Sequence, residues 1–140
     1  MSDLFHAFIL DMERHDCRLS LSTPRSFELF FEPGFPVVSA LNDSDNAVVT
    51  DVWISCISGF PTITQEFVLG TILEINHYTL LQNQGVFGLD EQMQIVLSRS
   101  DLLEHLTVHA YAENLSVMLE QALRLQRLLL MLHPVIMINA

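Results

Sequence analysis

The chain has 140 residues, half of them hydrophobic, and a mean hydropathy of +0.36. No stretch reaches the roughly 18 to 20 uninterrupted apolar residues that a membrane helix needs, because Arg124, Arg127 and His133 interrupt the longest candidate. The first 30 residues carry acidic side chains where a signal peptide needs a basic start and an apolar core. We therefore expect a soluble, cytoplasmic chain that forms a single domain over residues 1–140.

The charge is strongly negative. Seventeen acidic residues face six basic ones, all of them arginine, for a formal net charge of −11. Such a chain repels phosphate backbones, so we expect no nucleic-acid partner. The acidic surface either steers a basic partner or keeps an apolar protein in solution. The excess of hydrophobic side chains must still be covered, and a dimer interface or a bound partner is the usual cover.

The N-terminal part of the chain predicts one helix followed by three strands. Apolar residues between Leu4 and Met12 form one stripe at helical spacing, which predicts a helix over 3–15. Partly alternating apolar residues and the turns between them predict an antiparallel meander. Its three strands are expected at 26–32, 37–41 and 47–57.

The second helix is expected to start after Pro61, where Thr62 and Gln65 have the spacing of a capping box. Apolar residues then cover two of its faces, which in a small domain indicates two neighbours: the sheet and a second subunit. Gly70 costs about 1 kcal/mol relative to alanine in such a position. It is explained either by the close approach of another backbone or as a tolerated glycine. We predict a symmetric dimer with four residues near its axis: Phe67, Gly70, Thr71 and Glu74.

The C-terminal part predicts a hairpin and a long helix. Short apolar strands at 86–89 and 93–97 flank an acidic turn. A short separate turn is expected at 101–104. Apolar residues at spacings of three and four then predict a helix over 107–132, and Pro134 is expected to end it.

No group of residues predicts catalysis. The chain has no G-x-S-x-G, no phosphate loop and no H-E-x-x-H. His105 and His109 have a spacing that can bind a metal on one helix face, but a third ligand is not evident and the pair straddles a helix start. The two cysteines, Cys17 and Cys56, match no metal or redox motif, and we expect both to be buried or half-buried thiols. We predict no catalytic, cofactor or metal site.

The segment 70–115 carries the most specific pattern in the chain: a helix, a short loop, a glycine-rich start of a hairpin, a strand ending in Leu-Ser-Arg, and the start of a long helix. In this segment, and in its length, acidity and order of elements, the chain resembles the class I type III secretion chaperones (the CesT-like, or Tir chaperone, family). The resemblance covers residues 4 to about 129. Its motif positions are Gly85, Gly88, Leu89, Asp90, Leu97, Ser98 and Arg99.

The resemblance implies an α+β fold: a twisted antiparallel sheet with three helices, in the order helix, three strands, helix, two strands, helix, as a homodimer. It implies a non-enzymatic chaperone in the cytoplasm of a Gram-negative bacterium, which binds the N-terminal region of a secreted effector and keeps it secretion-competent. One alternative is an adaptor or regulator of the same fold that binds a secretion-apparatus or regulatory protein. Another is a small enzyme or ligand-binding protein that uses the apolar core as a pocket.

We predict that an extended client segment lays apolar side chains on the first helix and the first strands, where the family has a client groove. Phe30 stands between Glu28 and Glu32 on one strand face, which favours a surface anchor, although core packing is the alternative for each aromatic residue. The candidate client-binding residues are Phe5, Phe8, Phe30, Phe35 and Val37. The apolar C-terminal segment 123–140 departs from the family, and either packs on the dimer or contributes to the client surface.

Overall fold

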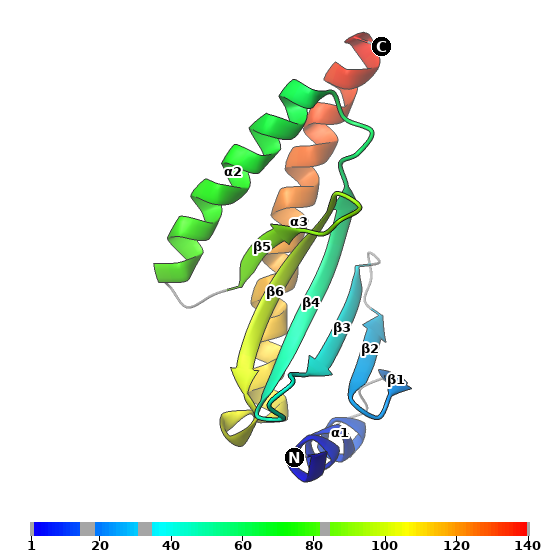
Figure 1. The fold of residues 1–140 in the computed structure, drawn as a ribbon, viewed down its shortest axis with the longest axis vertical. Helices are drawn as coiled ribbons and strands as arrows, with labels where there is room; N and C mark the ends of the chain where they lie inside the picture. The colour runs from blue at the N-terminus through cyan, green and yellow to red at the C-terminus, as the bar shows by residue number, and fades with distance from the viewer. Residues whose placement is uncertain (1, 15–18, 31–34, 82–84, 140) are drawn as a thin grey trace.

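The computed structural model describes residues 2–14, 19–30, 35–81 and 85–139, which form an α+β fold with one antiparallel sheet (Figure 1). Within these ranges, the side chains of residues 2, 3, 19–22, 30, 80, 81 and 133–139 are outside the description. The elements in chain order are α1 (Ser2–Arg14), β1 (Leu19–Thr23), β2 (Ser26–Phe30), β3 (Pro36–Leu41), β4 (Ala47–Cys56), α2 (Thr62–Leu81), β5 (Val86–Leu89), β6 (Gln94–Leu102), a short 3-10 helix η1 (Leu103–His105) and α3 (Val108–Asn139).

The sheet has six strands in the order β1-β2-β3-β4-β6-β5, all paired antiparallel. The predicted meander and hairpin are confirmed, and β6 is longer than predicted because it pairs with nearly all of β4. It starts one residue later than expected because Met93, with a φ of 63°, still belongs to the turn. Strand β1, at one edge, was missing from the sequence prediction, since its alternating leucines and serines form only a short and weakly apolar run.

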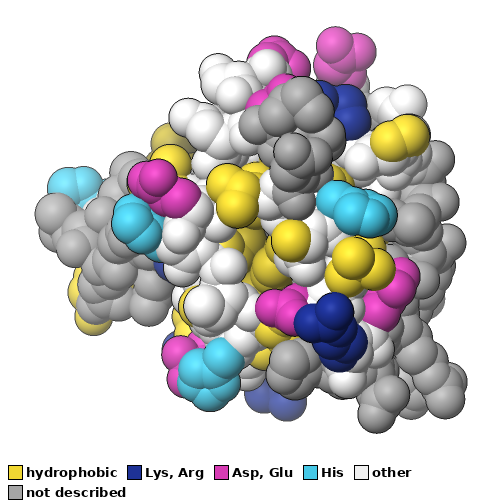
Figure 2. Space-filling view, turned by 90° about the horizontal axis from the view of Figure 1, so that it is seen from below, with side chains coloured by type: hydrophobic (Ala, Val, Ile, Leu, Met, Phe, Trp, Pro, Cys, Tyr) yellow, Lys and Arg dark blue, Asp and Glu magenta, His cyan; other side chains and the backbone are white. Residues whose placement is uncertain are grey.

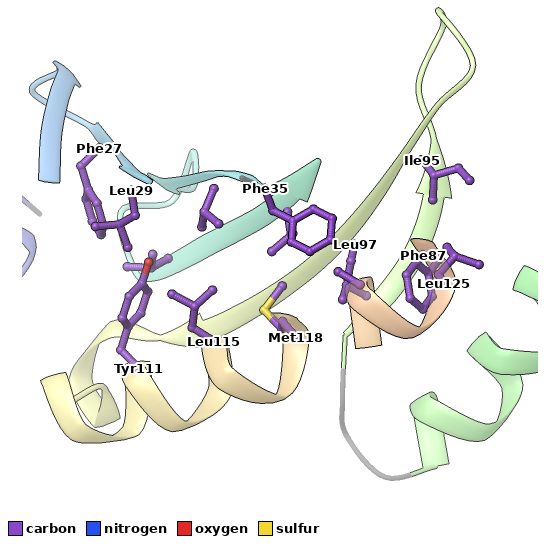
Figure 3. Packing of buried hydrophobic residues seen from close by; sticks show 14 of the residues in the cluster. Phe27, Leu29, Phe35, Phe87, Ile95, Leu97, Tyr111, Leu115, Met118 and Leu125 are labelled. Carbon is purple, nitrogen blue, oxygen red and sulfur yellow. The ribbon is translucent and has the colours of Figure 1, made fainter. Parts of the chain in front are cut away.

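Helix α3 runs along one face of the sheet and presents a regular apolar stripe to it (Figures 1 and 3). The stripe has alternating spacings of four and three residues, which keeps its members on one side of a helix. All six are at most 5% exposed: Tyr111, Leu115, Met118, Ala122, Leu125 and Leu129. Phe27 and Leu29 of β2 cover one end of the stripe, and Phe87 of β5 lies near the other, beside Leu125. This packing forms the core.

A chain of three buried hydroxyl groups fastens α3 to the sheet. The Ser39 hydroxyl lies 2.8 Å from that of Thr50 and 2.6 Å from that of Tyr111. All three side chains are buried. A hydroxyl oxygen that lost its partner at that depth would cost about 1–3 kcal/mol. The network therefore joins β3, β4 and α3 at one fixed register.

The ends of the helices differ from the prediction. The structure continues α3 through Pro134 to Asn139, so the expected end at Pro134 is wrong; a proline weakens a helix by about 3 kcal/mol but does not have to terminate it. The capping box is also wrong, because Thr62 is itself the first helical residue. Gln65 instead donates its side-chain amide to the carbonyl of Phe60, at 2.9 Å, and ties the preceding loop to α2. No helix in the described part of the chain is long and apolar enough to cross a membrane.

Candidate binding surfaces

Four of the five residues predicted to meet a client lie in the core. Phe5, Phe8, Phe35 and Val37 are between 1% and 6% exposed, so their predicted exposure is wrong. The Phe5 ring stacks on Phe27 with centroids 6.0 Å apart, and Phe8 meets Tyr111 edge-on at 5.4 Å. The physical reason is that α1 packs against β2 and α3 through its one strongly apolar stripe, so the residues of this stripe are buried. The side chain of Phe30 lies outside the description.

Helix α1 keeps two leucines in solvent, outside its buried residues. Leu4 is 56% exposed and Leu10 is 41% exposed. Figure 2 shows hydrophobic side chains gathered in the middle of the end of the molecule where α1 lies, among acidic, histidine and arginine side chains. Leu102, at the end of β6, is a further exposed apolar residue of this end, at 51%. Sequence reasoning chose the right helix for spare apolar surface but the wrong residues of it.

Helix α2 carries the largest exposed apolar side chains. Its inner side buries Val68 and Ile72, and the Asn76 side-chain amide binds both backbone groups of Phe87, at 2.7 Å each, which fixes α2 to β5. Its outer side is open to solvent over four large residues with these exposed fractions: Ile63 78%, Phe67 55%, Leu73 69% and Tyr78 61%. The predicted division of α2 into two apolar faces is confirmed.

The four residues predicted at a dimer axis lie on or beside this outer side. Phe67, Gly70 and Glu74 are exposed, and Thr71 is half-buried with its hydroxyl donating to the Phe67 carbonyl at 2.9 Å. A Cβ added to Gly70 would meet no atom within 4 Å. The close backbone approach that would explain this glycine is therefore not made inside the chain. Dimerisation itself stays a prediction.

A groove of about 630 Å³ lies between α2, β5 and α3. Its apolar lining comes from Ile75, Tyr78, Phe87, Val117, Leu125 and Leu128. Charged residues also line it: Glu74 from α2, and Glu120 and Arg124 from α3, which pair at 2.9 Å. Sequence reasoning missed this groove because three separate elements build it, and no single stretch of sequence carries its pattern.

The two histidines with a metal-binding spacing in the sequence do not come together in the structure. His105 belongs to η1 and lies 3.3 Å from Glu104, whereas His109 belongs to α3 and lies 3.0 Å from Glu113, so the two histidines do not share a helix face. Among the described residues there is no group of three or more His, Cys, Asp or Glu placed to hold a metal ion.

Cys56 is exposed at the end of β4, so the expected burial of this thiol is wrong; Cys17 lies outside the described residues. The hydrogen bond from the side chain of Ser58 lowers the pKa of the Cys56 thiol, assisted by the backbone of Ser58. The Ser58 hydroxyl oxygen lies 3.1 Å from the sulfur. No histidine or carboxylate is hydrogen-bonded to the sulfur among the described contacts, so the geometry does not form a nucleophile–base pair.

Comparison with known proteins shows the fold. No family model matches the chain, and no curated protein matches it. Among solved structures, a chain of the ExsC–ExsE complex is 20% identical, with a TM-score of 0.73 over 91% of this chain and 96% of that chain. A chain of the HopA1–SchA chaperone–effector complex is 18% identical, with a TM-score of 0.69 over 91% of this chain and 97% of that chain.

A third solved structure has the same architecture. It is the Yersinia pestis type III secretion chaperone SycH in complex with a stable fragment of YscM2; the matched chain is 15% identical, with a TM-score of 0.65 over 89% of this chain and 98% of that chain. Likeness at these identities establishes a shared fold. The fold of this chain is therefore the one found in type III secretion chaperone complexes.

Proposed function

We propose that this chain is a type III secretion chaperone of the class I, CesT-like group. It binds the N-terminal region of a secreted effector in the cytoplasm of a Gram-negative bacterium and keeps that effector secretion-competent. The observation that supports this most is the shared fold, over about nine-tenths of both chains, with proteins solved in a chaperone–effector complex and as a type III secretion chaperone. Fold alone does not determine function, so the surfaces must also suit the task.

The surfaces suit a protein that binds another protein and performs no chemistry. The described side chains include exposed apolar groups on α1 and α2, while the charge of the whole chain is −11. Exposed apolar patches of this kind often mark sites where another protein binds. A client segment with apolar anchors and basic residues between them would complement both features. No enzymatic activity is part of the proposal.

The client surface is proposed on the exposed face of α1 and on the neighbouring edge of the sheet. Leu4 and Leu10 replace Phe5 and Phe8 as the candidate anchors on this helix, because they are the leucines that α1 leaves in solvent. Strand β1 is the outermost strand on this side, and the outer edge of such a strand can pair with an extended peptide. Main-chain bonds would then supply affinity, and the leucines would select apolar client residues.

The functional unit is proposed to be a homodimer built on α2. Phe67, Gly70, Thr71 and Glu74 are placed near its axis because the outer side of α2 is apolar and has no cover within the described chain. A dimer would cover this side and leave α1 of each copy free for a client.

Co-expression with N-terminal segments of secreted proteins tests the proposal. A client segment should copurify with the chain and should be protected from protease. The variant Leu4→Ser/Leu10→Ser should capture less client at an unchanged melting temperature, whereas the matched variant His6→Ser, also exposed on α1, should capture as much as wild type. Absence of any copurifying secreted segment would contradict a chaperone. A bound partner that is never exported would favour an adaptor or regulator instead.

A further inference from the structure

The C-terminal end of α3 has an apolar sequence all the way around the helix. Residues 128–138 are apolar except for His133. Because an α-helix has about 3.6 residues per turn, any four consecutive apolar residues already cover its circumference. Leu129 is the last buried member of the stripe on the sheet, whereas Leu130 and Met131 are 61% and 73% exposed. A helix segment of this composition needs an apolar environment on more than one side.

This end of α3 lies far from α1 and extends beyond the sheet. Figure 1 shows the last turns of α3 past the ends of the strands, at the opposite end of the long axis from α1. The high exposure of Leu130 and Met131 agrees with this position. A surface that binds the end of α3 would therefore leave α1 accessible.

The charge of the chain changes sign along α3. Residues 1–120 hold all seventeen acidic residues and four of the six arginines, which gives a formal charge of −13. Residues 121–140 hold no acidic residue and two arginines, Arg124 and Arg127, which gives +2. Both arginine side chains are exposed. An apolar helix end with basic side chains beside it is the composition of a segment that binds an anionic lipid surface.

Distances along the helix show that the carboxylates of α3 do not prevent such binding. Arg127 precedes Met131 by four residues, about 6 Å, whereas Glu120, the last acidic residue of the chain, precedes Met131 by eleven residues, about 16 Å. The Debye length at physiological ionic strength is about 8 Å. Arg127 is thus within one screening length of a surface at Met131, and Glu120 is about two lengths away. On α3, the attraction of the arginine outweighs the repulsion of the glutamate.

The apolar segment is long enough to enter one leaflet and too short to cross a bilayer. Its eleven residues make about 16 Å of helix, roughly half of the ~30 Å hydrocarbon core. Segments that bind at the interface enter about 5–10 Å into the boundary between headgroups and acyl chains. A groove on another protein would suit this segment less well, because it takes up one apolar face of a helix. Lipid surrounds the helix on every side.

We propose that residues 128–138, at the end of α3, insert into the surface of an anionic membrane. Leu130 and Met131 lie among the upper acyl chains, and Arg124 and Arg127 lie at the level of the lipid phosphates. The contact is peripheral. It goes beyond the proposed function, because it assigns a lipid surface to a segment for which client binding and pairing through α2 have no use. The chain would then lie at a membrane with α1 free for a client.

Flotation with lipid vesicles in physiological salt tests the proposal. The full chain should float with vesicles of phosphatidylglycerol and phosphatidylethanolamine, and at least fivefold less with vesicles of phosphatidylcholine alone. Leu130→Ser/Met131→Ser should reduce binding to the anionic vesicles at least tenfold, because two apolar side chains no longer leave water. Its melting temperature should not change, since both residues are exposed. The matched variant Leu4→Ser/Leu10→Ser, also at two exposed apolar residues, should float as wild type does.

The contribution of charge has its own matched pair. Arg127→Gln should lower binding to the anionic vesicles roughly fivefold, the contribution of one basic residue close to such a surface. Arg14→Gln, at an exposed residue of α1, makes the same change in net charge and should alter binding less than twofold. Equal effects of the two substitutions, or equal flotation with both kinds of vesicle, would contradict a role for the arginines of α3.

The outcomes separate this proposal from the proposed function. Failure to float, or equal flotation of wild type and Leu130→Ser/Met131→Ser, would overturn the membrane contact and would leave client capture as it is. The two double variants should have opposite defects: Leu130→Ser/Met131→Ser should keep client capture and lose flotation, and Leu4→Ser/Leu10→Ser should do the reverse. If Leu130→Ser/Met131→Ser instead loses a protein partner in sedimentation and keeps its flotation, the end of α3 is a protein contact and the proposal is wrong.

Discussion

Helices α1 and α2 present the same kind of apolar residues to opposite environments. In α1, Phe5 and Phe8 are buried against β2 and α3, and the exposed apolar residues are Leu4 and Leu10 on either side of them in the sequence. In α2, Phe67 and Tyr78 face the solvent, although the helix also buries Val68 on its inner side. Helix α1 has one strong stripe and one set of neighbours, so the stripe is core. Helix α2 has two stripes and one set of neighbours inside the chain, so one stripe remains for another molecule.

The largest expected difference in the free energy of unfolding is between replacing a phenylalanine of α1 and replacing one of α2. Phe5→Ala should lower the free energy of unfolding by about 3–5 kcal/mol, because a fully packed ring leaves a cavity in the core. Phe67→Ala should leave the unfolding free energy of the monomer within about 1 kcal/mol of wild type. Denaturant titration at concentrations low enough to keep the chain monomeric measures both. Equal losses would erase the distinction between the two helices.

A bulky residue at Gly70 should weaken the dimer and spare the fold. Gly70→Leu should raise the dissociation constant at least tenfold, or about 1.4 kcal/mol, because the side chain separates two backbones. The monomer should not be destabilised, since a Cβ at Gly70 meets no atom within 4 Å and leucine favours helix over glycine. Gly70→Ala is the matched control, with higher helix propensity and little bulk. If sedimentation shows an unchanged dimer for Gly70→Leu, then α2 is not part of the interface.

Removing the Tyr111 hydroxyl tests how much its hydrogen bond stabilises the packing of α3 on the sheet. Tyr111→Phe should lower the free energy of unfolding by about 1–3 kcal/mol, because the buried Ser39 hydroxyl loses one of its two partners. Tyr78→Phe removes an exposed hydroxyl from α2 and should change unfolding by no more than about 0.5 kcal/mol. Thermal unfolding compares the two. A cost for Tyr78→Phe equal to that for Tyr111→Phe would show that the outer side of α2 is buried.

The smallest expected effect concerns charge on α2. Glu74→Gln should tighten the dimer by about 0.2–1 kcal/mol at low salt, because it removes the repulsion between the two copies of Glu74 near the proposed axis. The gain should shrink as salt is added, since these carboxylates are exposed until the dimer forms. The matched substitution Glu113→Gln, on α3, should have no effect on dissociation. A weaker dimer for Glu74→Gln would show that this carboxylate has an attractive partner across the interface.

Features that depend on the residue pattern within one helix or strand could be predicted from the sequence. The stripe on α3, the strands β2 to β6 and the two faces of α2 all follow from local periodicity, and the structure contains them. The choice between core and surface for Phe5 and Phe8 was wrong because it depends on which neighbours lie beside α1. Leu4 and Leu10 of α1 are apolar as well, and only packing against Phe27 and Tyr111 identifies Phe5 and Phe8 as the buried residues.

The candidate site was less predictable than the fold. The residues near Gly70 were predicted at a dimer axis because an apolar helix with two faces needs two neighbours, and that placement stays a prediction. The groove beside Tyr78 could not be predicted, because it arises where α2 stands apart from α3 above β5. Strand β1 was missed because five residues of alternating leucine, serine and threonine carry too little apolar character to stand out.

Deletion of the gene in its source organism tests the central claim most directly. The proteins secreted under conditions that induce type III secretion would be compared, by mass spectrometry, between wild type, the deletion and the deletion complemented with the wild-type chain. A chaperone predicts that one or a few secreted proteins disappear from the medium, that all others remain, and that complementation restores the missing ones. An unchanged set of secreted proteins, or a loss of all of them, would contradict an effector-specific chaperone.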